Sequence, residues 1–245
     1  MLELPPGTAH LWYVFQDEIR DPALLDAYRG LMTPAEAERQ ARFMFPKGRH
    51  EHLVTRALVR TTLSRYAPVN PRAWSFAIGE RGRPEIAGPE GAPPLRFNLS
   101  HTDGLIACLV THDLDVGVDV EDTLRTSSTV DIADRFFSPS EVRELRAQPA
   151  ERQRTRFFEY WTLKEAYIKA RGMGLALPLD QFSFHLDEGP EIRISFDPRL
   201  VDDPESWQFS LYRPSGRHMM AAAIRKGRGR PPLSIELREV VPLAL

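Results

Sequence analysis

Two acidic residues lie close together near the middle of the chain. Asp119 and Glu121 alternate with apolar residues in Gly117-Val118-Asp119-Val120-Glu121, a pattern that predicts a β-strand. Residues two apart on a strand point to the same face, so both carboxylates face one side. Such carboxylates repel each other unless a cation lies between them, and a hard divalent ion such as Mg²⁺ prefers oxygen ligands. The alternative interpretation is two carboxylates at an exposed strand end.

A second group of polar residues lies on a predicted helix. Glu165 and Lys169 are four apart within Trp161-Thr162-Leu163-Lys164-Glu165-Ala166-Tyr167-Ile168-Lys169, so both side chains face the same side. Judged by spacing alone, they are best explained as an exposed ion pair that stabilises the helix.

A third group, Ser100, His101 and Thr102, ends a predicted strand that begins at Phe97. These side chains can donate hydrogen bonds to an anion, or they can form a simple polar turn. The chain has no P-loop and no dinucleotide-binding fingerprint, because Gly172-Met173-Gly174 lacks a third glycine and follows a predicted helix.

An internal repeat indicates how these groups are positioned. Thr33-Pro34-Ala35-Glu36 and Ser138-Pro139-Ser140-Glu141 are the same helix-start signal, with a hydroxyl N-cap, proline at the first helical position and a glutamate that completes a capping box. A strand precedes each signal, and an amphipathic helix follows it, over residues 51–66 and 152–171. A strand-turn segment and then a hairpin follow in each half.

Each half therefore reads β-α-α-β-β-β, and the fold class is α+β with two tandem subdomains related by pseudo-two-fold symmetry. We expect an N-terminal subdomain at residues 1–112 and a C-terminal subdomain at residues 113–245. When the repeats are aligned on their capping boxes, Asp119 aligns with Val14 and Glu121 with Gln16. The first half is thus apolar or neutral at the positions where the second half is acidic. Duplicated folds commonly bind their ligand between the two halves.

Composition limits the classes of protein that this chain can be. The 245 residues are 42% hydrophobic and 27% charged, with a net charge of -2, which is ordinary for a globular protein. The total charge gives no attraction to nucleic acid or membrane, and the apolar runs are too short to span a bilayer. Cys108 is the single cysteine, which excludes an internal disulfide and a multi-cysteine zinc site. We expect a cytoplasmic protein that binds neither nucleic acid nor membrane.

Taken together, the motifs resemble those of the Sfp-type 4′-phosphopantetheinyl transferases. The resemblance is carried by Phe97-Asn98-Leu99-Ser100-His101, by Gly117–Glu121, by Arg135-Phe136-Phe137-Ser138 with Glu141, by Trp161–Lys169 and by Gly172–Leu179. The combination of the acidic strand and the helix motif some forty residues later is specific, although either alone is weak. The match runs in order from about Arg39 to Phe184, and residues 226–245 carry no motif of this family.

The resemblance implies a reaction. Members of the family move the phosphopantetheine arm of coenzyme A onto a serine of an apo acyl, peptidyl or aryl carrier protein, which gives the holo carrier and adenosine 3′,5′-bisphosphate. It implies a holo-[acyl-carrier-protein] synthase type of transferase that depends on Mg²⁺, with Mn²⁺ as an alternative, and uses coenzyme A as co-substrate. A monomer is the simplest expectation, because both halves contribute to one site.

The resemblance also assigns roles to residues. Asp119, Glu121 and Glu165 are the expected metal ligands, and Glu165, or a water that it holds, takes the serine proton. Lys164 and Lys169 are expected to hold the phosphates, with His101 and Ser100 reaching them from the first half. Binding of the nucleotide is assigned to a basic set that comprises Arg39, Arg42, Arg49, His52 and Arg83.

For the carrier protein we expect contacts with the loop of residues 123–129, including Leu124 and Arg125, and with Arg143 and Arg146 of the next helix. Two other functions stay open at this point. The same carboxylates can position water in a Mg²⁺-dependent phosphohydrolase, and a degenerate copy of the fold can bind carriers without catalysis. The identity of the carrier and the tolerance for acyl-coenzyme A are not readable from the sequence.

Overall fold

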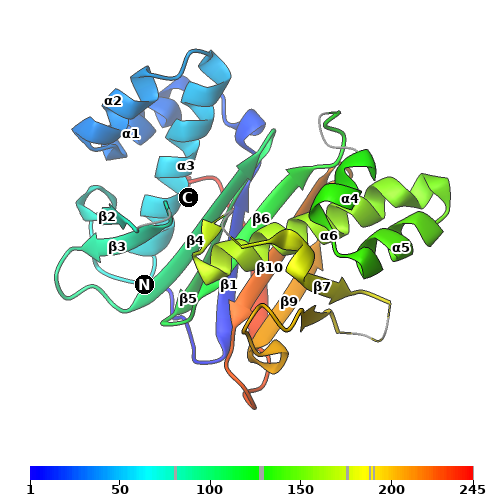
Figure 1. The fold of residues 1–245 in the computed structure, drawn as a ribbon. Coiled ribbons are helices and arrows are strands. Elements are labelled where there is room, and N and C mark those ends of the chain that lie inside the picture. The colour runs from blue at the N-terminus through cyan, green and yellow to red at the C-terminus, as the bar shows by residue number, and fades with distance from the viewer. Residues whose placement is uncertain (80–81, 127–129, 175–176, 188, 190, 245) are drawn as a thin grey trace. The chain divides into compact units, whose positions relative to one another are not determined.

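The computed structural model describes residues 1–79, 82–126, 130–174, 177–187, 189 and 191–244. The chain forms two compact units that mix helices and strands (Figure 1). Unit 1 comprises Met1–Asp113 and Ser234–Leu245, and unit 2 comprises Leu114–Leu233. Both ends of the chain therefore belong to unit 1.

Unit 1 begins with strand β1 (Thr8–Val14), and three helices follow it. They are α1 (Pro22–Leu31), α2 (Pro34–Ala41) and α3 (Pro46–Ser64). The remaining strands of the unit are β2 (Ser75–Ile78), β3 (Pro84–Gly88), β4 (Leu95–Thr102), β5 (Leu105–His112) and β11 (Ser234–Glu239). Short 3-10 helices lie at Gln16–Glu18 and Pro71–Ala73.

Unit 2 has a similar order of elements. It starts with β6 (Val116–Asp122), and the helices are α4 (Ala133–Phe136), α5 (Pro139–Ala147) and α6 (Ala150–Arg171). Its later strands are β7 (Phe182–His185), β8 (Arg193–Phe196), β9 (Trp207–Tyr212) and β10 (His218–Arg225). Short 3-10 helices lie at Val130–Ile132, Leu179–Gln181 and Pro204–Ser206.

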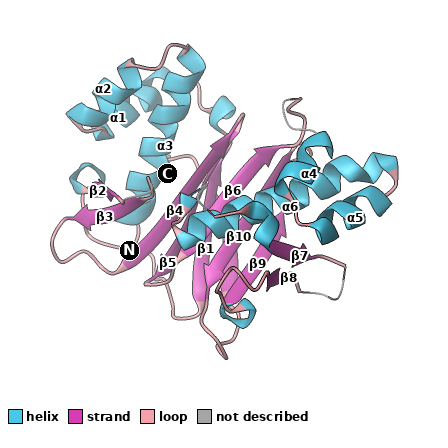
Figure 2. Ribbon diagram, in the orientation of Figure 1, coloured by secondary structure: helices cyan, strands magenta, loops and turns pink. Residues whose placement is uncertain are grey.

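The α+β class and both helix-start signals are confirmed (Figure 2). Thr33 caps α2 and Ser138 caps α5, each with the reciprocal bond from the glutamate three residues later. The order differs from β-α-α-β-β-β in two respects. Helices α1 and α4 precede the capped helices, and four strands follow the helices within each continuous half.

The position of the last twelve residues also differs from the expectation of a 113–245 subdomain. Strand β11 pairs in parallel with β1, from Thr8 opposite Ser234 to Tyr13 opposite Glu239. Tyr28 is buried and its hydroxyl donates to the Pro242 carbonyl at 2.7 Å. The segment from Ser234 onward therefore belongs to the core and sheet of unit 1. Unit 2 is, in chain order, an insertion between β5 and β11.

The sheets place the acidic strand against the long helix of unit 2. The main sheet of unit 1 has the order β11-β1-β5-β4, and that of unit 2 has the order β6-β10-β9; β2 pairs with β3 and β7 with β8. In unit 2, Asp119 lies opposite Ala221 and Glu121 opposite Met219. Helix α6 packs on β6 and β10.

Gly117 explains how closely α6 approaches β6. A Cβ atom at this position would lie 2.0 Å from the Ala166 carbonyl oxygen and 2.5 Å from the Ala170 backbone nitrogen. Only glycine allows this approach, which brings the start of the acidic strand against the turn of α6 that follows Glu165. At its end α6 stops at Gly172, whose φ of 61° is the left-handed conformation that glycine adopts readily at helix C-termini.

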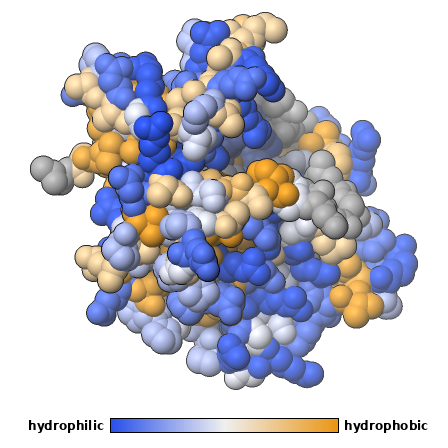
Figure 3. Space-filling view, turned by 90° about the vertical axis from the view of Figure 1, so that its left-hand side faces the viewer, coloured by the Kyte–Doolittle hydropathy of each residue, from blue (hydrophilic) through white to orange (hydrophobic). Residues whose placement is uncertain are grey.

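Each unit has its own hydrophobic core. The core of unit 2 is rich in aromatic rings from α6 and the adjacent strands, among them Phe157, Tyr160, Tyr167 and Phe209. Much of the face drawn in Figure 3 is hydrophilic, with apolar groups scattered over it. No helix in the described part of the chain is long and apolar enough to cross a membrane.

Candidate functional site

The predicted metal ligands come together within unit 2. Asp119 and Glu121 lie on β6, and each residue is only 5% exposed. Glu165 lies on α6, the helix that packs against this strand. The interpretation of the two acids as an exposed strand end is therefore wrong, because all seven residues of β6 are buried.

The charges of these carboxylates interact. Burial raises the pKa of Glu121 to about 8, and the neighbouring Asp119 adds to the increase. Burial also raises the pKa of Glu165, again helped by the charge of Asp119. Removal from water and mutual repulsion thus both favour the protonated form of the two glutamates.

Two side-chain cations partly neutralise the cluster. The Lys169 ammonium lies 2.7 Å from Asp119 Oδ1, and the Arg125 guanidinium lies 2.7 Å from Glu121 Oε2. The lysine therefore links α6 to β6, which an exposed ion pair along one helix would not do. For Glu121, the loss of hydration outweighs the bond from Arg125, since its pKa stays above the usual range.

The donor types of the cluster fit a hard divalent cation. Three carboxylates supply oxygen ligands, and burial together with the charge of Asp119 raises the pKa of two of them. Among the described residues, however, no group of three or more His, Cys, Asp or Glu side chains is already placed to hold a metal ion. Lys169 and Arg125 bond to one oxygen each of two of the three carboxylates, so a divalent cation there competes with both side chains.

The expectation that Lys164 binds phosphate is wrong. Its side chain is 1% exposed, and the ammonium donates to the carbonyls of Leu179 at 2.8 Å and Phe182 at 2.6 Å. It also forms an ion pair with Glu141 Oε2 at 2.7 Å. The physical reason is the face of α6 on which it lies, which is turned into the core. Lys164 therefore connects α5, α6 and the start of β7 through these bonds.

In unit 1, His101 and Ser100 lie near the end of β4, as predicted. Ser100 is buried and pairs with Ala107 of β5, whereas the His101 side chain is 53% exposed. His101 Nδ1 lies 2.9 Å from Glu51 Oε1. Burial raises the pKa of Glu51, but the bond and charge of His101 outweigh it and lower that pKa below its usual value. This carboxylate behind the histidine was not predicted.

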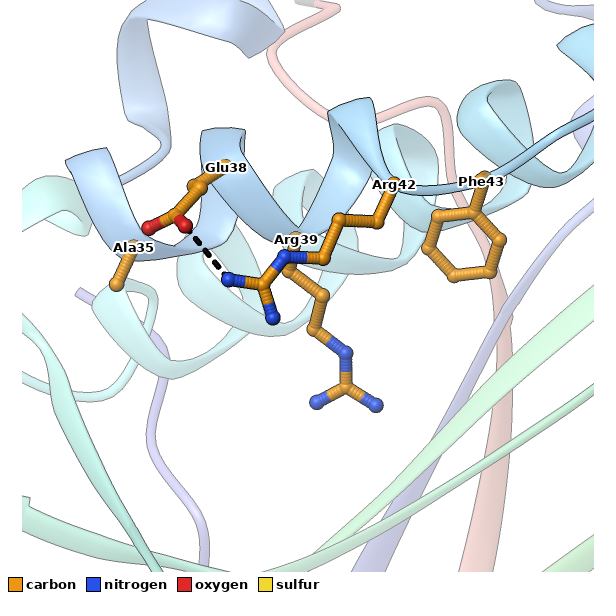
Figure 4. A pocket seen from close by; sticks show the side chains of 5 residues that line it. All are labelled: Ala35, Glu38, Arg39, Arg42 and Phe43. Atoms are coloured by element: carbon orange, nitrogen blue, oxygen red, sulfur yellow. Dashed lines mark hydrogen bonds and ion pairs between the residues drawn. The ribbon is translucent and has the colours of Figure 1, made fainter.

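The basic residues Arg39, Arg42 and Arg49 lie around the junction of α2 and α3, and all are exposed. Arg39 and Arg42 line a pocket of about 620 Å³ together with Phe43 (Figure 4). Arg42 forms an ion pair with Glu38 at 2.6 Å. The Arg39 side chain extends away from Glu38 in Figure 4. Arg49 Nε donates to the Phe43 carbonyl at 2.9 Å.

His52 does not present a cation for phosphate, contrary to the prediction. Its Nε2 lies 3.2 Å from the Glu36 carbonyl oxygen, and its ring packs beside Phe43. Burial lowers the pKa of His52, and the charge of Arg56 lowers it further. Both effects disfavour the charged ring, and the ring packs between α2 and α3.

Arg83 lies in the turn that was predicted to bind the nucleotide, after Gly82 with a φ of 86°. Its guanidinium is 2.8 Å from Glu85 Oε1, and this bond lowers the pKa of Glu85. Any phosphate would therefore compete with Glu85 for this arginine.

The residues expected to meet a carrier protein have different environments. Leu124 is 67% exposed and Arg143 is exposed, whereas Arg146 is paired with Asp134. Arg125 is directed to Glu121 and so belongs to the acidic cluster. Residues 127–129 of the predicted loop, and Leu175 and Ala176 of the stretch after α6, lie outside the described residues.

Comparison with known proteins decides the family. The profile of the 4′-phosphopantetheinyl transferase superfamily matches residues 115–223, and that of the 4′-phosphopantetheinyl transferase N-terminal region matches residues 22–113. The chain is 35% identical over 175 residues to the 4′-phosphopantetheinyl transferase HetI of Nostoc sp. strain PCC 7120, covering 71% of this chain and 73% of the relative. The chain belongs to the 4′-phosphopantetheinyl transferase superfamily.

Other relatives agree with this membership. The 4′-phosphopantetheinyl transferase Sfp of Bacillus subtilis strain 168 is 32% identical over 169 residues, which cover 69% of this chain and 73% of that protein. A crystal structure of Thermotoga maritima holo-[acyl-carrier-protein] synthase matches 47% of this chain and 65% of its own, at 24% identity and a TM-score of 0.38. Membership of the family is therefore assigned from the sequence matches alone.

Proposed function

We propose that this 4′-phosphopantetheinyl transferase moves the phosphopantetheine arm of coenzyme A onto a serine of an apo acyl, peptidyl or aryl carrier protein, with a divalent cation at its acidic cluster. The products are the holo carrier and adenosine 3′,5′-bisphosphate, as for a holo-[acyl-carrier-protein] synthase. One observation carries the proposal: Asp119 and Glu121 are buried on the strand that packs against the helix of Glu165, burial and the charge of Asp119 raise the pKa of both glutamates, and Lys169 lies beside Asp119.

Asp119, Glu121 and Glu165 would hold Mg²⁺, or Mn²⁺, which has similar oxygen chemistry. When bound, the cation would neutralise negative charge on the pyrophosphate oxygens of coenzyme A. Asp119 forms an ion pair with Lys169, and Glu121 forms one with Arg125. These pairs support the assignment, because they put positively charged groups beside the same carboxylates.

Glu165 is the proposed base for the carrier serine. The proton passes from the serine hydroxyl to a carboxylate oxygen of Glu165, directly or through one water molecule. Burial and the charge of Asp119 raise the pKa of Glu165, whereas a bound cation would lower it and make the carboxylate a weaker base, which favours transfer through the water molecule. Its position on α6, packed on β6, holds it beside the acids with which it shares the site.

Lys169 and His101 are the proposed contacts for the phosphates. Lys169 follows Glu165 by one helical turn, and its ammonium already lies beside the acidic cluster. It can donate to the leaving bisphosphate, and loss of one such donor typically costs about 10²–10³ in rate. His101 is exposed and backed by Glu51, which orients the ring, while Ser100 of the same strand offers a hydroxyl.

The nucleotide end of coenzyme A requires cations because it carries a 3′-phosphate. Arg49 and Arg83 are the proposed contacts, with Arg39 and Arg42 at the pocket near Phe43. Arginine suits a phosphate because its planar fork bonds two oxygens. We accordingly propose that residues 1–112 bind the nucleotide, and that the part of residues 113–245 in unit 2 binds the metal and the carrier. We further propose a cytoplasmic monomer with one site per chain.

The test is an intact-mass assay of an apo carrier protein incubated with the enzyme, coenzyme A and Mg²⁺. A carrier with serine replaced by alanine, an EDTA arm and a Glu165→Gln variant are run in parallel. Glu151→Gln, an exposed glutamate in the first turn of the same helix, is the matched control.

The proposal predicts that the carrier gains the mass of one phosphopantetheine arm, with release of adenosine 3′,5′-bisphosphate. The gain is lost with EDTA, with Glu165→Gln and with the alanine carrier, and is kept with Glu151→Gln. Bisphosphate release without a carrier would indicate hydrolysis of coenzyme A. Full transfer in the EDTA arm would overturn the metal assignment.

A further inference from the structure

Arg125 is bonded to one of the proposed metal ligands from within the same chain. It lies in the turn that follows β6, four residues after Glu121, and its guanidinium lies 2.7 Å from Glu121 Oε2. The side chain is 30% exposed, whereas that of Glu121 is 7% exposed. The partly exposed guanidinium of Arg125 is thus bonded to a buried carboxylate of the preceding strand.

The backbone of this turn is fixed independently of the Arg125 side chain. The Leu124 N–H donates to Asp122 Oδ1 at 3.0 Å, and the Thr123 N–H donates to the Arg217 carbonyl at 2.8 Å. From α6, Arg154 donates to the carbonyl of Thr123 at 2.7 Å and to that of Arg125. The guanidinium of Arg125 can therefore leave Glu121 without unfolding of the turn.

The Arg125 side chain itself is weakly anchored. Besides the bond to Glu121, it lies over the Phe158 ring at 5.5 Å, a ring that Arg154 also covers at 5.2 Å. Its Nε atom is buried and donates no hydrogen bond within the described part of the chain. One carboxylate oxygen is thus the main attachment of this charge, and a divalent cation needs the same carboxylate.

We propose that Arg125 is an internal counter-ion of the acidic cluster, which leaves Glu121 when the site takes up its divalent cation and then contacts the acidic surface of the carrier protein. The inference rests on the proposed function, since it assigns the cation to Asp119, Glu121 and Glu165. Leu124, 67% exposed in the same turn, supplies an apolar contact beside the released guanidinium. Metal binding and carrier docking are then coupled, and the coupling acts equally in both directions.

The first experiment measures Mn²⁺ binding to the whole protein, without coenzyme A or carrier, by electron paramagnetic resonance of the free ion. The variant Arg125→Gln removes the competing charge. Arg199→Gln is the matched control, because Arg199 is an exposed arginine of unit 2 that also pairs with an acid, Asp197. Glu165→Gln removes a proposed ligand.

We expect Arg125→Gln to bind Mn²⁺ about fivefold more tightly than the wild type, as loss of a competing, partly exposed ion pair would give. Arg199→Gln should bind as the wild type does, and Glu165→Gln should bind much more weakly. Equal or weaker binding in Arg125→Gln, with weak binding in Glu165→Gln, would overturn this inference alone. Wild-type binding that Glu165→Gln does not reduce would overturn the metal site itself.

A second measurement separates this role from a merely structural one. The KM for an acidic carrier protein should rise in Arg125→Gln although its dissociation constant for Mn²⁺ falls. A variant that only disturbs the turn would weaken both interactions. An unchanged KM for the carrier would show that the released arginine does not touch it, and would overturn the coupling.

Discussion

Replacing Lys164 by methionine should destabilise unit 2 without changing how the folded enzyme binds coenzyme A. The ammonium is enclosed, donates to the carbonyls of Leu179 and Phe182, and is paired with Glu141. Methionine keeps most of the volume of the side chain but removes the charge and both donors. Two carbonyls and one buried carboxylate then lose a partner.

The magnitude follows from what remains bonded after the change. Breaking a buried ion pair by removing one partner costs about 3–5 kcal/mol. Glu141 keeps the Ser138 N–H at 2.9 Å on Oε2 and the Phe184 N–H at 2.9 Å on Oε1. The loss should therefore lie near the lower value, about 3 kcal/mol, which is a large part of the roughly 5–15 kcal/mol that stabilises a typical protein.

The assay is urea unfolding followed by tryptophan fluorescence, together with the KM for coenzyme A of the folded variant. With a urea slope of about 1–3 kcal/mol/M, the midpoint should fall by at least about 1 M. The control is Lys47→Met, since Lys47 is 59% exposed and pairs with Asp103 on the surface, where a pair contributes about 0–1 kcal/mol. A stable Lys164→Met variant with a strongly raised KM for coenzyme A would refute this reasoning and restore Lys164 as a phosphate ligand.

Three further predictions concern the elements around the site. Gly117→Ala should push β6 away from α6, costing about 1–3 kcal/mol or more and lowering transfer activity, as thermal unfolding and the intact-mass assay would measure; an active variant of normal stability would contradict the close approach. Deletion of residues 234–245 should expose the edge of β1 and lower the melting temperature of unit 1, with aggregation visible by size-exclusion chromatography; an unchanged melting temperature would contradict the pairing of β11. Burial lowers the pKa of His10, with a smaller contribution from Arg238, so the folded state disfavours its protonation, and stability should be lost as the pH falls below about 6.5, the ordinary histidine value. His10→Gln should lose less stability between pH 7 and pH 5 in urea unfolding, and an identical loss in both proteins would rule His10 out as the cause.

Local signals in the sequence were sufficient for the capped helices. Thr33, Ser138 and Gly172 act within one helical turn, and the structure places each where its chemistry predicts. Helix α1 carries a weaker start signal, because Asp21 caps it and proline follows, but Leu24 stands where a capping box has glutamate. The sequence of β11 alternates polar and apolar residues from Ser234 to Leu237. Its partner β1 lies at the other end of the chain, and no local pattern encodes that pairing.

The pair of carboxylates on β6 could be predicted because its evidence is local, whereas Glu165 was assigned to the same site only through the family resemblance. The spacing of Asp119 and Glu121 fixes their common face, and the difference between the repeats singles out the same pair. Lys164 and Lys169 are five apart on α6 and so face different sides, a periodic signal that could have separated the buried lysine from the one at the site. Their actual partners, and the bond from Glu51 to His101, depend on tertiary contacts.

The central claim is that the carboxylates of β6 and α6 carry the transfer reaction. The most direct measurement is the single-turnover rate of phosphopantetheine transfer to an apo carrier, at saturating Mg²⁺ and coenzyme A, for Glu165→Gln beside Glu151→Gln. Both substitutions lie on α6, and unfolding in urea checks that both proteins are folded. We predict that Glu165→Gln transfers at least about 10²-fold more slowly than the wild type, and that Glu151→Gln transfers at the wild-type rate. A folded Glu165→Gln enzyme that transfers at the wild-type rate would contradict it.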